Sequence, residues 1–170
     1  MAEDTRTDPP TAGGEREMLR AWLDWHRETL AVKCEGLTEE QLRLRSVPPS
    51  SLSLLGLVRH MADVERSWFR RRINGEDLAG IYYTEDDPDG EFDNVDTASA
   101  EEAFAVWQEE IRHARAAEAA CADLDTMTRT ARQGVHYSLR WVIIHMIEEY
   151  ARHNGHADLL RQRIDGATGE

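Results

Sequence analysis

Four long segments of the chain carry apolar side chains at the three- and four-residue spacing of an amphipathic helix. The first segment ends at a glycine, and a serine precedes each of the other three, as expected at the ends of helices. No segment shows the alternation of a strand, and we find no internal repeat. The pattern predicts an all-α four-helix bundle, in which the connections after the first two helices are long enough for a crossover. The predicted helices cover residues 15–35, about 50–74, 99 to about 121 and 138 to about 164.

The ends of the chain lack this spacing. Residues 1–14 are polar and contain Pro9-Pro10 and Gly13-Gly14, so we expect a disordered leader. Residues 15–165 are expected to form the single folded domain, followed by a flexible tail over residues 166–170. The leader has no apolar stretch like that of a signal peptide, and no apolar run approaches the ~20 residues that cross a bilayer. These features favour a cytoplasmic protein without a membrane partner.

A long acidic connection, residues 76–98, separates the second and third helices. Between Glu85 and Asp96 its carboxylates approximate the ligand spacing of an EF-hand calcium loop. The first position is Glu where Asp is expected, and residues 81–84 make a poor helix end. We therefore interpret the segment as a solvated acidic loop, in which residues 85–96 are also a candidate surface for a partner protein.

The charge and the cysteine content exclude several classes of function. The formal net charge of −13 argues against binding to nucleic acid or to anionic membranes, because phosphate groups require a basic surface. Only two cysteines occur, Cys34 and Cys121, which is too few for a disulfide framework or a zinc–cysteine cluster. Both lie in predicted helices, where we expect reduced core thiols.

Candidate metal ligands lie on the second and the last predicted helix. His60 falls near the edge of the apolar stripe of the second helix, whereas Glu149 and His153 lie one turn apart on the last helix. A buried carboxylate costs several kcal/mol unless it is paired or binds a metal, so Glu149 requires a partner. A metal ion and a plain Glu149–His153 hydrogen bond fit the spacing equally well. His145 and His156 lie on the same flank, as further ligands or as supports of the ligands.

The donor set limits the choice of metal. Two imidazoles and one carboxylate suit zinc, nickel or ferrous iron. Three protein ligands leave coordination positions open for water or substrate, as in catalytic metal centres.

The segments around these candidates resemble the DinB-like superfamily. Residues 139–161, with a His-x-Gly motif at His153, look like its last helix, and residues 54–68, with His60, look like its second helix. The resemblance extends over about residues 15–165. It points to the actinobacterial branch long described as a domain of unknown function, which is related to the mycothiol-dependent maleylpyruvate isomerase.

This resemblance implies a DinB-like bundle with a three-ligand metal site, often in a homodimer. His60 matches the ligand of the second helix, and His153 matches the histidine of the His-x-Gly motif. Glu149 occupies the position four residues earlier, where the maleylpyruvate isomerase has Glu and many relatives have His. His156 departs from the family, in which Gln is common at this position, and it leaves the number of ligands open.

The resemblance also implies a class of reaction. Relatives catalyse transfer or isomerisation with a low-molecular-weight thiol such as mycothiol or bacillithiol, here acting on a small electrophile. A metal would favour the thiolate, so the protein need not supply its own nucleophile. Arg140 is a candidate for holding a substrate carboxylate. The alternative hypothesis is a non-enzymatic metal-binding module in a stress response or an interaction.

Overall fold

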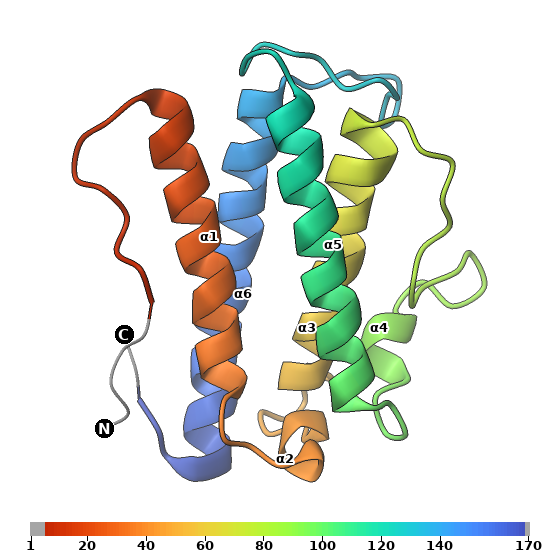
Figure 1. Ribbon diagram of the computed structural model, residues 1–170. Coiled ribbons are helices and arrows are strands. Elements are labelled where there is room, and N and C mark those ends of the chain that lie inside the picture. The colour runs from red at the N-terminus through yellow and green to blue at the C-terminus, as the bar shows by residue number, and fades with distance from the viewer. Residues whose placement is uncertain (1–5, 169–170) are drawn as a thin grey trace.

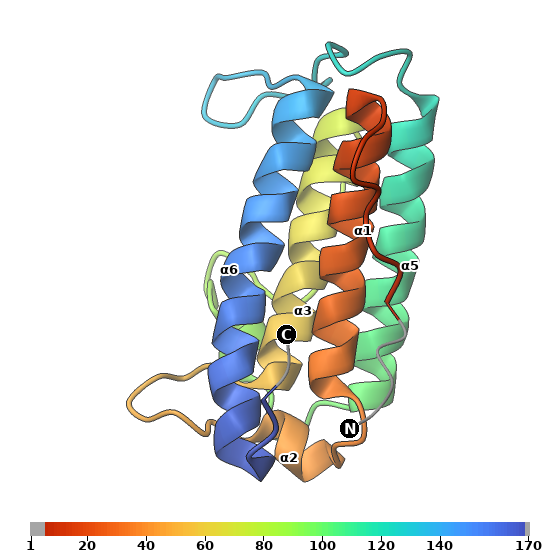
Figure 2. The same cartoon turned by 90° about the vertical axis from the view of Figure 1, so that its left-hand side faces the viewer.

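The protein is described by a computed structural model that covers residues 6–168. Four long helical segments pack side by side as a bundle (Figures 1 and 2), and two short helices lie in the connections. Among the described residues there are isolated bridge pairs but no strand, so the predicted all-α bundle is confirmed. The elements are α1 (Glu15–Cys34), α2 (Glu39–Arg43), α3 (Leu54–Glu65), the π-helix η1 (Arg66–Ile73), α4 (Gly90–Asp93), α5 (Ala100–Ala120) and α6 (Leu139–Asp165).

The helices begin at side-chain caps. Ser53, Ser99 and Ser138 each accept a hydrogen bond from the backbone N–H three residues later, at the start of α3, α5 and α6. Thr38 opens α2 with a reciprocal capping box. Gly166 ends α6 with a φ of 78°, a left-handed conformation that glycine adopts without strain.

The second predicted helix consists of two parts. The hydrogen-bond register changes after Glu65, and in η1 the N–H of Asn74 donates to the carbonyl oxygen of Phe69 at 3.0 Å. A π-helical stretch of this kind widens the helix by one residue per turn and often occurs at functional sites. The end predicted near Asn74 is confirmed.

The long helices form two parallel pairs, α1 with α6 and α3 with α5. Helices α1 and α6 run in the same direction, because Arg161 donates to the carbonyl oxygen of Lys33 at one end and Arg140 pairs with Glu15 at the other. Helices α3 and α5 also run in the same direction (Figure 1). Between them residues 74–99, here called the crossover segment, return along the length of the bundle. The sequence allowed for this long crossover.

The crossover segment is not solvated throughout, which corrects the sequence interpretation. Glu85 and Asp93 are exposed as expected, but Gly90 and Glu91 are buried where α4 packs on α3. Buried Arg59 of α3 donates to the carbonyl oxygens of Gly90 and Glu91 at 3.1 and 3.0 Å. The turn residues and the high charge of the segment indicate a solvated loop. They do not indicate this contact, because it joins α4 to a helix more than twenty residues earlier in the chain.

The interior contains a closed polar network, here called the core network. Arg27 donates two hydrogen bonds to Glu65, at 2.8 and 2.7 Å, and the hydroxyl of Tyr150 donates to the same carboxylate at 2.8 Å. The indole of Trp107 donates to the Tyr150 oxygen at 2.9 Å. All four side chains are buried. Because both carboxylate oxygens have donors, the buried charge is compensated within the protein.

Both ends of the chain extend beyond the described residues. Residues 1–5 of the predicted leader and 169–170 of the predicted tail lie outside the described residues, and the domain limits stay a prediction. The Arg6 guanidinium lies 4.6 Å from the centre of the Trp25 ring on α1.

Cys34 and Cys121 are unpaired and buried, as expected. Within residues 6–168 we find no helix long and apolar enough to cross a bilayer.

Candidate metal centre

Three predicted ligands meet between α3 and α6. His60 comes from α3, and Glu149 and His153 come from α6; one ligand atom of each lies within 4.8 Å of the others. The imidazole centroids of His60 and His153 are 4.8 Å apart. The side chains retain 23%, 21% and 12% of their exposure, so solvent reaches the group. We call these three residues the His–Glu cluster.

Hydrogen bonds orient both imidazoles of the cluster through the same ring nitrogen. Nδ1 of His60 lies 3.1 Å from Oε1 of Glu91, and Nδ1 of His153 lies 3.3 Å from Nδ1 of His156. An ionised carboxylate only accepts, so the His60 ring is the donor to Glu91. When His153 likewise donates to His156, Nε2 of each ring is left for a metal. Metal-binding histidines commonly show this arrangement.

Glu149 lies between two imidazoles. Its Oε1 is 3.3 Å from Nε2 of His145, and its Oε2 is 3.6 Å from Nε2 of His153. The interaction with His153 lowers the pKa of Glu149, and the neighbouring histidines reinforce it against the opposing effect of burial. Glu149 is therefore anionic at neutral pH. A half-buried anion among imidazoles suits a divalent cation, and the residues fit a metal ion.

His145 belongs to a neighbouring group. One ligand atom each from His145, Glu148 and Glu149 lie within 4.8 Å of one another. The His145 ring stacks on Trp141 with centroids 4.9 Å apart, and it meets Trp68 edge-on at 4.9 Å. Burial lowers the pKa of His145, although Glu149 opposes this effect. His145 thus contacts Glu149 of the His–Glu cluster. Its role as a ligand stays a prediction.

His156 and Arg140 lie further from the centre of the cluster. His156 touches the outer nitrogen of His153, and burial lowers its pKa. Arg140 lies thirteen residues before His153 on α6, which corresponds to about 20 Å along the helix. It pairs with Glu15 at 2.6 Å and with Asp125. The structure therefore does not bring Arg140 to the cluster, and its role in holding a substrate carboxylate stays a prediction.

Glu91 is the residue of the site that sequence reasoning missed. Its side chain is only 8% exposed and contacts His60. Burial opposes ionisation, but the hydrogen bond with His60 and the charge of Arg59 leave the pKa of Glu91 lowered. Its Oε2 is buried and has no hydrogen-bond partner among the described residues. The available signal was the apolar pair Phe92 and Val95, three residues apart within the acidic run.

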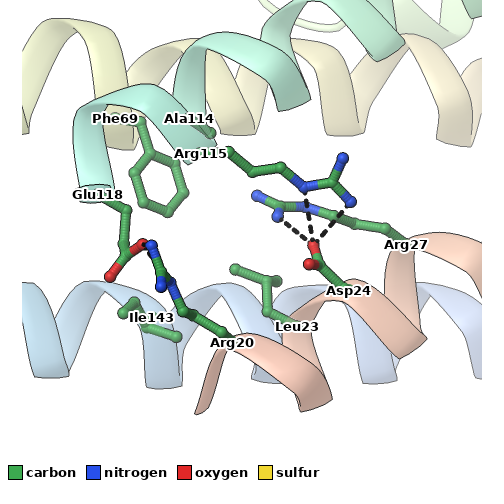
Figure 3. A pocket seen from close by; sticks show the side chains of 9 residues that line it. All are labelled: Arg20, Leu23, Asp24, Arg27, Phe69, Ala114, Arg115, Glu118 and Ile143. Carbon is green, nitrogen blue, oxygen red and sulfur yellow. Dashed lines mark hydrogen bonds and ion pairs between the residues drawn. The ribbon is translucent and has the colours of Figure 1, made fainter. Parts of the chain in front are cut away.

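A separate groove of about 250 Å³ lies between α1 and α5, helices that carry no member of the His–Glu cluster (Figure 3). Arg27 and Arg115 both point to Asp24, and Arg20 pairs with Glu118. These guanidinium groups already have carboxylate partners, so the groove is a poor site for a charged ligand.

Comparison with known families identifies the group to which the chain belongs. The mycothiol S-transferase family model matches residues 18–166, a range that includes the whole His–Glu cluster and Glu91. This protein belongs to the mycothiol S-transferase family. The family is part of the DinB-like superfamily, so the resemblance seen in the sequence is confirmed. No curated protein matches the chain.

Proposed function

We propose that the protein is a metal-dependent S-transferase that joins mycothiol to a small electrophile. The observation that carries this proposal is the meeting of His60, Glu149 and His153 in a chain of the mycothiol S-transferase family. The family favours mycothiol over bacillithiol as the thiol, and transfer over isomerisation as the reaction. The His–Glu cluster is where we place the metal.

The donor atoms determine what each residue would do there. His60 and His153 would hold the ion through Nε2, and the anionic Glu149 would balance part of its charge. A divalent ion in this position supplies Lewis acidity, which lowers the pKa of a thiol so that a thiolate is available near neutral pH. Zinc, nickel and ferrous iron all suit two imidazoles and one carboxylate.

The transfer itself requires little further chemistry from the chain. The thiol sulfur forms a bond to the electrophilic carbon, and the bond from that carbon to the leaving group breaks. The leaving group departs with the electron pair, and the thiol proton passes to water. The partial exposure of the cluster leaves it in contact with solvent.

The test compares the wild type with His153→Ala in the metal-loaded state, using mycothiol and a panel of small electrophiles. We expect thioether formation above the buffer rate in the wild type and a loss of at least about 100-fold in His153→Ala, because one metal ligand is removed. His113→Ala is the matched control, since His113 lies on α5 and pairs with the exposed Glu109 and Arg112. No rate above buffer with any electrophile, or equal rates in all three proteins, would argue against the proposed function.

A further inference from the structure

We propose that Glu91 is a positioning residue of the metal centre, which fixes His60 in the tautomer that presents Nε2 to the ion. The inference rests on the proposed function, because it assumes that the His–Glu cluster binds a metal. It assigns a role to the crossover segment, which the sequence presented as an acidic loop.

The burial of Glu91 separates it from the other carboxylates of the crossover segment. Glu85, Asp89 and Asp93 are exposed to solvent, whereas the Glu91 side chain is turned inward and is 8% exposed. Its Oε1 accepts from His60, and its Oε2 is buried without a partner among the described residues. Burying a carboxylate with one of its oxygens left without a hydrogen bond is unfavourable. A cation on the far side of the His60 ring would supply the missing compensation.

One face of α3 holds the crossover segment in place around His60. Arg59 donates to two carbonyl oxygens of α4, and its guanidinium lies 4.1 Å from the centre of the Tyr82 ring. Asp63 accepts from the backbone N–H groups of Ile81 and Tyr82 at 2.6 and 3.0 Å. Arg59, His60 and Asp63 follow the spacing of one helix face. The same face therefore carries the candidate ligand and the contacts that hold Glu91 beside it.

Packing restricts the His60 ring as well. The ring stacks on Phe92 with centroids 5.2 Å apart and meets His153 on another side. Phe92 sits close over α3 at Gly56, where a Cβ would lie 2.9 Å from the Phe92 ring. Phe92 thus limits how the His60 ring turns, while Glu91 selects which nitrogen carries the proton. Both residues come from the same turn of α4.

The experiment combines zinc affinity with the tautomer of His60. Zinc dissociation constants would be measured for the wild type, Glu91→Gln, Glu91→Ala and the exposed control Asp93→Asn. We expect a loss of about 10- to 100-fold in Glu91→Ala, the usual effect of removing a carboxylate behind a ligating histidine. Glu91→Gln keeps an acceptor without the charge, so we expect a smaller loss. Asp93→Asn should bind zinc like the wild type.

The tautomer is read from nitrogen-15 chemical shifts of the His60 ring in the metal-free proteins. We expect a proton on Nδ1 in the wild type and in Glu91→Gln, and a mixture of tautomers in Glu91→Ala. Circular dichroism verifies that each variant is folded. Wild-type zinc affinity in folded Glu91→Ala, or an unchanged tautomer in that variant, would overturn the inference.

The two measurements separate this inference from the proposed function. If the wild type binds no zinc, nickel or ferrous iron, the proposed function and the metal role of Glu91 fail together, whatever the tautomer is. If the wild type binds zinc but Glu91→Ala binds it equally well, only the role of Glu91 fails.

Discussion

Two carboxylates of the same bundle, Glu65 and Glu149, face the interior in different surroundings. Glu65 is 0% exposed and accepts from Arg27 and Tyr150 at 2.7 to 2.8 Å. Glu149 keeps 21% of its side-chain exposure and faces the imidazole nitrogens of His145 and His153 at 3.3 and 3.6 Å. The first carboxylate is compensated by a permanent positive charge. The second lies among imidazole groups, which bind metals well.

The difference separates a charge that is compensated within the protein from a charge that we propose binds a metal ion. In the core network every donor and acceptor that we describe is used inside the protein, so the network stabilises one arrangement of the helices. In the His–Glu cluster Nδ1 of His60 and of His153 have partners outside the cluster, whereas Nε2 of His153 faces the Glu149 carboxylate at 3.6 Å, where we propose the metal ion. The same contrast applies to the groove between α1 and α5, whose guanidinium groups are already paired.

The largest effect is expected from breaking the core network. Arg27→Met leaves Glu65 buried without its positive partner, so we expect the free energy of unfolding in urea to fall by about 3–5 kcal/mol. Arg20→Met is the matched control: Arg20 is 48% exposed and pairs with Glu118, so its loss should cost at most about 1 kcal/mol. Equal losses in the two variants would show that the core network carries no special stability.

A smaller effect is expected from Cys34, whose buried thiol should not react as a nucleophile. Burial raises the pKa of Cys34 to about 12, even though Arg161 opposes this shift. At pH 8 only about one Cys34 thiol in ten thousand is then ionised, and the side chain is 4% exposed. We expect no alkylation of Cys34 by iodoacetamide in the native protein and unchanged transferase activity in Cys34→Ser. Rapid alkylation at pH 8 would place Cys34 with the reactive groups instead of the core.

The sequence was sufficient to predict the features that depend on a single helix. The serine caps, the terminal glycines and the one-turn spacing of Glu149 and His153 are local features, and the structure has the caps and glycines where they were expected. His60 was predicted from its place on an apolar stripe, and it does lie beside His153.

The sequence was insufficient to predict the contacts that join distant segments of the chain. Glu91 is buried because Arg59, more than thirty residues earlier, binds the backbone of α4. The pairing of Glu65 with Arg27 has no local signal, since only the packing of α1 against α3 places them together. The change of register at η1 has no signal that we can identify in the sequence. The burial of Glu91 and the pairing of Glu65 with Arg27 depend on tertiary contacts and not on local periodicity.

The central claim is that His60, Glu149 and His153 bind one metal ion, and the metal content of the purified protein tests it most directly. Wild-type protein prepared with zinc, nickel and ferrous iron available, then freed of excess metal, should retain one ion per chain. Glu149→Gln, which removes the anionic ligand and nearly preserves its shape, should retain far less. No stoichiometric metal in the folded wild type, or equal metal in the wild type and Glu149→Gln, would contradict the account.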